Sequence, residues 1–276
     1  MKLSDGYNIP CPGFGTFKTP DGELCIDAVR EAIAAGYTHI DTAAVYGNEK
    51  SVGAGVNQGG KPRKELFITS KVWNTDRGYD STLRACEKSL NNLGMDYLDL
   101  YLIHWPANTL QFGDKAASIN LDTWKAMERL VDEGLVRSIG LSNFYPNHLA
   151  PIIANANIAP VVDQIEYHPG LLQKETLDIC RKNSILVEAW SPLGRGKLLE
   201  DPVLVEIAAR HGKTTAHVII SWCIQNGVLP LVKSTHAARI RENLDYGGFS
   251  LDKHEMEAIS ARPEIRIGSH PDTATF

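Results

Sequence analysis

Four side chains that could carry out acid–base chemistry stand at or just after the ends of short apolar segments. Asp41 ends the segment YTHID, and Tyr46 follows it after five residues. Lys71 comes directly after the segment LFITS, and His104 comes directly after LDLYLI. In a parallel α/β barrel the catalytic groups gather where the strands end. The spacing therefore predicts that Asp41, Tyr46, Lys71 and His104 share one face of such a barrel.

These residue types suit the reduction of a carbonyl group. A tyrosine has an ordinary pKa of about 10, so it is a weak proton donor near neutral pH. A lysine ammonium ~4 Å from Tyr46 could stabilise the phenolate by up to roughly 4 kcal/mol, or about three pKa units. Asp41 would keep Lys71 charged, and His104 could orient a carbonyl oxygen. Tyr46 would then act as the general acid, and a nicotinamide bound nearby would supply the hydride.

Each of the four residues also has an ordinary interpretation. An isolated Asp41 would cap a helix or turn, Tyr46 would be a rim aromatic, Lys71 would be solvated, and His104 would be a partly buried histidine with its hydrogen bonds satisfied. Complementary groups at three successive strand ends favour the catalytic hypothesis over these separate explanations.

The composition sets limits on size, partners and compartment. The 276 residues are 43% hydrophobic, which is enough for one barrel domain spanning residues 1–276. The net charge of −5 gives no basic field for nucleic acid. Five scattered cysteines without metal-ligand spacing predict reduced thiols in a cytoplasmic protein, and no metal is expected. No apolar run is long enough to span a membrane. No extended apolar helix face is evident, so we expect a monomer.

Apolar and amphipathic segments alternate along the chain in a way that is typical of a single (β/α)8 TIM barrel, an α/β fold. Strands are predicted at 13–17, 38–40, 66–69, 98–103, 136–141, 161–165, 186–189 and 228–232. Helices are predicted at 23–35, 49–56, 81–93, 121–132, 146–155, 174–182, 202–210, 215–225, 237–243 and 253–260. A β-hairpin over residues 3–12 precedes the barrel, and extra helices follow it near the C-terminus. Residues 105–120 and 262–276 are predicted to be long loops.

Polar residues also follow the later strands. Ser142, Asn143 and Gln164 could bind a carboxamide through paired donors and acceptors, although turn capping accounts for Ser142 and Asn143 equally well. Trp190 could stack on a flat ring, whereas an isolated tryptophan would belong to the core. These positions are consistent with a nicotinamide site beside the four acid–base residues.

The loops after the seventh and eighth strands could bind phosphate, as they commonly do in this fold. The seventh loop reads SPLGRGK from Ser191, and Gly194 within it could also serve an ordinary flexible turn. Lys233 and Arg239 bring positive charge after the eighth strand. The sequence contains no GxGxxG fingerprint, so a Rossmann domain is not supported.

Linked motifs along nearly the whole chain resemble the aldo-keto reductase family, and most closely its short microbial members similar to 2,5-diketo-D-gluconate reductases. The matching blocks are GFGTFK, GYTHIDTAAVYGNE, LFITSKVWN, LDLYLIHWP, IGLSNF, VVDQIEYHP, AWSPLGRGKL and VKSTHAARIRENL. The resemblance implies that Asp41, Tyr46, Lys71 and His104 form the catalytic tetrad. It also implies a small-molecule carbonyl substrate and NADPH or NADP+ as the cofactor.

The resemblance further assigns the surrounding positions. It implies carboxamide contacts at Ser142, Asn143 and Gln164, nicotinamide stacking at Trp190, a pyrophosphate loop at Ser191, Leu193 and Gly194, a 2′-phosphate site at Lys233, Ser234, Thr235 and Arg239, adenine contacts at Glu242 and Asn243, and substrate-pocket aromatics at Phe17, Trp73 and Trp105. His236 departs from the family pattern, because many relatives have Thr or Arg there.

Two other functions remain open at this stage. Some proteins that resemble this fold are nucleotide-binding regulatory subunits that sense redox state with little turnover. A different barrel enzyme, such as an isomerase using His104 and Glu166, would leave Trp190 and the basic loop after the eighth strand without a joint purpose.

Overall fold

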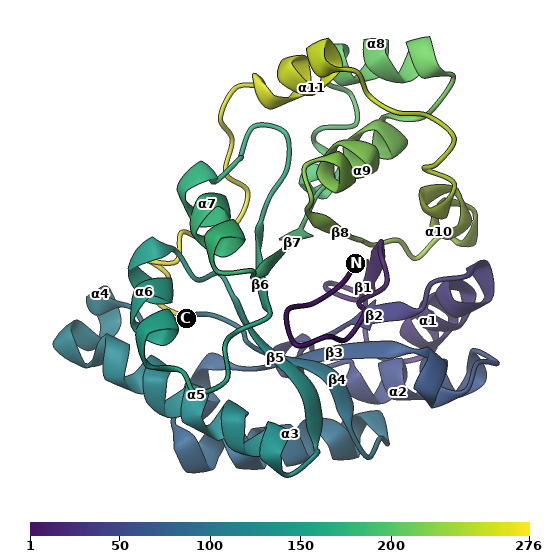
Figure 1. The fold of residues 1–276 in the computed structure, drawn as a ribbon. Coiled ribbons are helices and arrows are strands. Elements are labelled where there is room, and N and C mark those ends of the chain that lie inside the picture. Colours follow the sequence, from purple (N-terminus) through teal and green to yellow (C-terminus); the bar gives the residue numbers. More distant parts are fainter.

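Eight parallel strands form a closed barrel in the order β1 to β8, each hydrogen-bonded to its neighbours in the chain, and helices surround it (Figure 1). The computed structural model describes residues 1–276. The strands are β1 (Gly13–Gly15), β2 (His39–Asp41), β3 (Phe67–Val72), β4 (Leu98–Ile103), β5 (Val136–Ser142), β6 (Val162–Glu166), β7 (Leu186–Trp190) and β8 (Leu229–Val232). The predicted (β/α)8 barrel is confirmed.

The helices follow the predicted alternation. They are α1 (Glu23–Ala35), α2 (Glu49–Gln58), α3 (Tyr79–Leu93), α4 (Thr109–Phe112), α5 (Ala116–Asp132), α6 (Pro146–Asn155), α7 (Lys174–Lys182), α8 (Pro202–His211), α9 (Thr215–Gln225), α10 (Ala237–Leu244) and α11 (Lys253–Ser260). No helix combines the length and the apolar character needed to cross a membrane.

Local sequence explains why these elements form. All six residues of β4 are buried, as expected for a strand of a parallel barrel covered on both sides. Helix α1 buries residues at helical spacing, among them Cys25, Val29 and Ala32. It ends at Gly36, which has a φ of 119° and donates its N–H back to the last turn. The residue pattern and the glycine cap therefore fix this helix together.

The N-terminal hairpin closes the end of the barrel at which the strands begin. A single antiparallel bridge joins Lys2 and Asn8, which is less regular structure than a full pair of strands. Leu3 and Ile9 are buried in one cluster with Leu100 and Leu229 of the barrel wall. The first residues thus act as an apolar plug, so the opposite end of the barrel is the one left open for a ligand.

Two boundaries differ from the predictions in a way that affects the site. Lys71 lies inside β3 rather than after it, because Asp41 neutralises its charge within the barrel. The predicted loop at 105–120 contains α4 and the first turn of α5. Asn120 exchanges two side-chain hydrogen bonds with the backbone of Ala107, and this pairing extends α5 toward the barrel. The other predicted elements differ from the observed ones only at their ends.

The C-terminal segment beyond α11 has no regular secondary structure, as predicted, but it is firmly attached. The yellow segment in Figure 1 runs from α11 past α7 and ends beside α6. The buried amide of Asn108 donates to the carbonyl oxygens of Pro271 and Ala274, at 2.9 and 2.7 Å. This contact brings the end of the chain to the mouth of the barrel.

Candidate functional site

A cavity of about 1260 Å³ lies at the carboxyl ends of the strands. The predicted residues that line it are Asp41, Tyr46, His104, Ser142, Asn143, Gln164, Trp190, Ser191, Leu193, Lys233, Ser234, Arg239, Glu242, Asn243, Phe17, Trp73 and Trp105. Three predicted residues do not line it: Lys71 is buried beside Asp41, Gly194 is buried against Leu198, and Thr235 lies next to the lining residue Ser234. Most of the expected set is therefore brought together around one space.

Lys71 and Asp41 form a buried ion pair at the base of the cavity. Lys71 Nζ donates to both carboxylate oxygens of Asp41, at 2.8 Å each, and to the carbonyl oxygen of Thr42 at 2.9 Å. Nζ lies 5.2 Å from the centre of the Tyr46 ring. Tyr46 ends a short 3-10 turn after β2, which Gly47 closes with a φ of 70°. The turn thus places the phenol beside the ammonium, as the sequence predicted.

The pKa shifts in this group show which residues hold protons. Burial opposes the charge on Lys71, but Asp41, Tyr46 and Glu188 together outweigh it, so the pKa of Lys71 is raised. Burial also raises the pKa of Tyr46 above its ordinary value, and Lys71 offsets only part of the rise. The expected net lowering of the Tyr46 pKa is therefore wrong for the free chain, because desolvation outweighs the ammonium. Tyr46 carries its proton at neutral pH, and Lys71 reduces the cost of releasing it.

His104 is held as a neutral imidazole. Burial lowers the pKa of His104 well below its ordinary value, and the charge of Lys71 adds to the effect. Its ring centre is 5.6 Å from that of Tyr46 and 5.1 Å from that of Trp73. The ring atom Nδ1 is buried without a hydrogen-bond partner. A neutral histidine has one N–H donor, so His104 is suited to orient a carbonyl oxygen rather than to protonate it.

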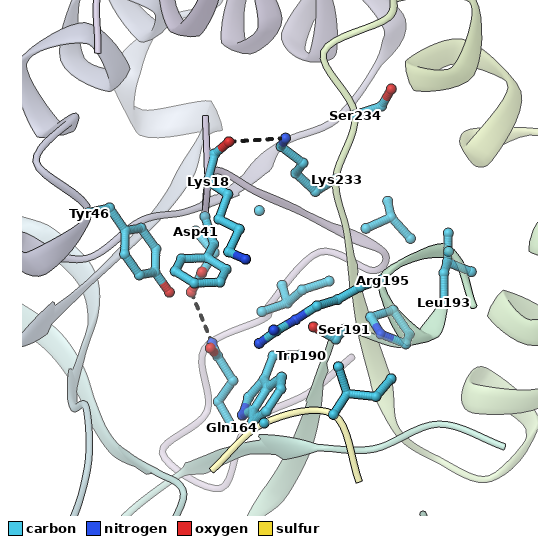
Figure 2. A pocket seen from close by; sticks show the side chains of 18 of the residues that line it. Lys18, Asp41, Tyr46, Gln164, Trp190, Ser191, Leu193, Arg195, Lys233 and Ser234 are labelled. Atoms are coloured by element: carbon cyan, nitrogen blue, oxygen red, sulfur yellow. Dashed lines mark hydrogen bonds between the residues drawn. The ribbon is translucent and has the colours of Figure 1, made fainter. Parts of the chain in front are cut away.

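Two side-chain amides, from Gln164 and Asn143, line the cavity beside the four acid–base residues. Gln164 Nε2 donates to Asp41 Oδ2 at 2.9 Å, a bond drawn in Figure 2. Asn143 Nδ2 donates to the carbonyl oxygen of His104 and to Ser142 Oγ, and Asn143 Oδ1 accepts from the indole N–H of Trp190 at 2.8 Å. The N–H groups of both amides thus donate to atoms of the protein, and the amide oxygens are left to accept hydrogen bonds from a ligand.

The loops after β7 and β8 form the long side of the cavity. Ser191, Leu193 and Arg195 come from the first loop, and Lys233 and Ser234 come from the second, as Figure 2 shows. Arg239 follows in α10, on the same lining. Backbone N–H groups, two hydroxyls and three cationic side chains in this arrangement can bind phosphate groups.

The backbone around the cavity is unusual as well. Four residues other than glycine line the cavity with a left-handed φ between 51° and 64°: Lys18, Asn143, Ser191 and Arg195. This conformation is uncommon outside glycine, and strained residues cluster at functional sites.

Aromatic rings form the wall nearest to Tyr46. The ring centre of Phe17 is 5.0 Å from that of Tyr46. Trp73 stacks on Phe276 at 5.6 Å, and Trp105 meets the same ring edge-on at 5.1 Å. The three predicted aromatics are therefore joined by a fourth from the C-terminal segment, and the space beside Tyr46 favours flat or small apolar groups.

Comparison with known proteins identifies the family. The sequence model described as "Aldo/keto reductase family" matches residues 13–262. The chain belongs to the aldo/keto reductase family. It is 47% identical to the glyoxal reductase of Bacillus subtilis, over 100% of this chain and 97% of that protein. It is 45% identical to the 9,11-endoperoxide prostaglandin H2 reductase of Trypanosoma cruzi, over 99% of this chain and 94% of that protein.

Solved structures of the family have the same fold. A mutant of Gox0644 in complex with NADPH has a TM-score of 0.92 and 41% identity, covering 100% of this chain and 98% of that one. A Bombyx mori aldo-keto reductase in complex with NADP has a TM-score of 0.88 and 34% identity, covering 98% and 94%. The prediction that this chain is an oxidoreductase of the aldo-keto reductase type is confirmed.

This aldo/keto reductase also places residues at the site that the sequence analysis did not identify. Lys18 and Arg195 line the cavity, and each holds its charged end within 6 Å of the Phe17 ring, at 5.7 and 5.9 Å. Both stand in the matched motifs, so the sequence signal was present. Phe276 is 202 residues from its hydrogen-bond partner Asn74, and no local pattern connects the two. Glu188 stands alone as a carboxyl in the apolar segment LVEAW, and that isolation was the available signal.

Proposed function

We propose that this aldo/keto reductase reduces small aldehydes and ketones to alcohols with NADPH as the reductant, and that Tyr46 supplies the proton. The observation that carries the proposal is that Tyr46, Asp41 and neutral His104 line one large cavity, with Lys71 buried directly behind Asp41 and Tyr46. That grouping supports delivery of a proton to a carbonyl oxygen held at this wall.

The residues present fit a dinucleotide. Gln164 and Asn143 offer amide oxygens that would accept from a carboxamide NH₂, and Trp190 would stack on the ring. The loop with Ser191, Leu193 and Gly194 would hold the pyrophosphate. The remaining contacts are proposed at the far end of the cavity, with Lys233, Ser234, Thr235 and Arg239 for the 2′-phosphate and Glu242 and Asn243 for the adenine. The volume of about 1260 Å³ exceeds that of a drug-sized pocket and leaves room for a carbonyl compound as well.

When bound, NADPH supplies a hydride to the carbonyl carbon of the substrate. The chain's own residues provide the other requirements. His104 donates a hydrogen bond that orients the carbonyl oxygen. Tyr46 gives that oxygen its proton as negative charge develops, and Lys71 stabilises the resulting phenolate. Asp41 keeps the ammonium charged and fixed through two hydrogen bonds.

The aromatic wall supports a preference for small substrates. Phe17, Trp73, Trp105 and Phe276 enclose the space beside Tyr46. Such a pocket suits methylglyoxal, glyoxal and aromatic aldehydes, and the glyoxal reductase relative is consistent with the dicarbonyls. Lys18 and Arg195 also line the cavity, and their positive charges would attract the carboxylate of a diketo sugar acid. Such acids are therefore also proposed as substrates.

The test is NADPH consumption with glyoxal, methylglyoxal, a diketo sugar acid and an aromatic aldehyde. We expect turnover of at least one of them, and a loss of about 10²- to 10⁴-fold in kcat for Tyr46→Phe, the range for removing a general acid. Tyr7→Phe, at an exposed tyrosine outside the cavity, is the matched control. Full activity of Tyr46→Phe would remove the proposed role. Tight NADPH binding without turnover of any compound would instead favour the regulatory subunit.

We also propose that residues 1–276 work as one barrel domain in a cytoplasmic monomer. All five cysteines are free thiols, which supports a reducing compartment. Light scattering coupled to gel filtration would reveal any larger assembly.

A further inference from the structure

A buried carboxyl group lies directly beneath the proposed catalytic residues. Glu188 is in β7, its side chain is inaccessible to solvent, and its Oε2 accepts from Gln164 Nε2 at 2.9 Å. The same Nε2 donates to Asp41 Oδ2 at 2.9 Å. One amide group therefore joins two carboxyl groups, and it is also an amide that faces the cavity.

The balance of charge among Asp41, Glu188 and Lys71 indicates that Glu188 is protonated. Asp41 and Glu188 share one ammonium, Lys71, and Lys71 is hydrogen-bonded to Asp41 alone of the two. Glu188 Oε1 has no hydrogen-bond partner, and the closest basic atom, His39 Nε2, is 3.8 Å away. An ionised oxygen buried without a donor is costly, whereas a neutral acid in the same place is tolerated.

The neighbouring groups leave Glu188 as the one that titrates near neutral pH. Burial, with the charge of Asp41, raises the pKa of Glu188 to about 8. On β2, burial lowers the pKa of His39 to about 3, and on β3 the pKa of Lys71 is raised. In the segment before β1, burial raises the pKa of Cys11 to about 12.

We propose that Glu188 is a positioning residue of the reductase site: through the amide of Gln164 it fixes the Asp41 carboxylate under Lys71 and turns the Gln164 oxygen toward the cavity. The inference rests on the proposed function. Because Asp41 and Glu188 take both N–H groups of Gln164, the amide cannot flip without losing two hydrogen bonds. Its oxygen is therefore presented as an acceptor for the carboxamide NH₂ of the cofactor.

The protonation state of Glu188 matters to Tyr46 through the same chain of contacts. Ionisation would place a second negative charge next to Asp41, in a layer with a single cation. Negative potential beside Tyr46 disfavours its phenolate and weakens it as an acid. The rate of reduction should therefore fall as the pH rises through about 8, well below the range in which Tyr46 itself loses its proton.

Two variants separate the roles of hydrogen bond and charge. Glu188→Gln keeps a neutral acceptor for Gln164, so we expect kcat at pH 7 to stay within about threefold of wild type and the decrease near pH 8 to disappear. Glu188→Leu removes the acceptor, so we expect the Kd for NADP+, measured by tryptophan fluorescence quenching, to rise about tenfold, as for one lost buried hydrogen bond. Glu128→Gln, at a buried glutamate of α5 outside the cavity, is the control.

Infrared difference spectroscopy adds a readout that does not depend on turnover. Wild type at pH 7 should show a carboxylic-acid C=O component that disappears above pH 8 and is missing from Glu188→Gln but present in Glu128→Gln. Buried Asp163, whose pKa burial also raises, would contribute a separate component that is the same in all three proteins. The proposal is overturned if Glu188→Gln keeps the wild-type band and pH profile, or if Glu188→Leu binds NADP+ like wild type. Should wild type reduce no carbonyl compound, the proposed function fails, while the infrared and binding results still decide the role of Glu188.

Discussion

Replacing Lys71 by methionine tests the electrostatic basis of the proposed reaction. The ammonium lies 5.2 Å from the centre of the Tyr46 ring, so at an effective dielectric constant of ~20 it stabilises the phenolate by about 3 kcal/mol. This energy corresponds to roughly two pKa units. If the proton is between half and fully transferred in the transition state, kcat should fall by about 10- to 200-fold. The KM for the carbonyl compound should change much less, because Lys71 does not line the cavity.

The same substitution also leaves the Asp41 carboxylate buried without its partner, which costs roughly 3–5 kcal/mol of folding free energy. The double variant Lys71→Met/Asp41→Asn removes both charges and should recover most of that stability. Single-turnover oxidation of NADPH, at a temperature where each variant is folded, isolates the chemical step. Both variants should be slow. If the stabilised double variant regains the wild-type rate, or if Lys71→Met is within threefold of wild type, the reasoning about charge is refuted.

Three further predictions concern stability and binding. The pKa of Glu188 rises from 4.5 to about 8 on folding. Its contribution to the free energy of unfolding is therefore complete below pH 4.5 and declines by up to about 5 kcal/mol as the pH rises to about 8. The stability of Glu188→Gln relative to wild type, measured by urea unfolding, should increase over that range and then stay constant. A Cβ added at Gly268 would lie 2.3 Å from the Trp190 ring, so Gly268→Ala should shift that ring and weaken NADP+ binding severalfold with little loss of thermal stability, as fluorescence titration and calorimetry would show. At Gly53 the added atom would meet the carbonyl oxygen of Leu93 at 2.2 Å, so Gly53→Ala should separate α2 from α3 and lower the free energy of unfolding by about 1–3 kcal/mol without changing KM.

Local pattern was sufficient for much of the fold. Strand β4 and helix α1 have the predicted bounds because apolar spacing and a terminal glycine are properties of the segment itself. Strand β3 was predicted to end before Lys71, since a lysine is rarely buried without a partner. The partner is Asp41, 30 residues away, and pairing over that distance is not encoded in the local pattern.

Most of the residues around the cavity could also be predicted from the sequence, whereas the interactions among the buried groups could not. Motifs at strand ends located the residues around the cavity, because the fold itself brings strand ends together. The net pKa of Tyr46 was not accessible, since it depends on how far burial opposes the ammonium. Glu188 was missed because a single carboxyl inside an apolar strand has meaning only once its neighbours Gln164 and Asp41 are known.

The left-handed backbone at Lys18, Ser191 and Arg195 bears on how this enzyme could be engineered. The backbone of each of these residues has a conformation that would cost glycine about 1 kcal/mol less in free energy. Glycine there would relax the loops and raise the melting temperature, but it would also remove a hydroxyl and two cations from the rim. A search for heat-resistant variants that scores stability alone would thus be drawn to these positions and would yield sturdier but slower catalysts.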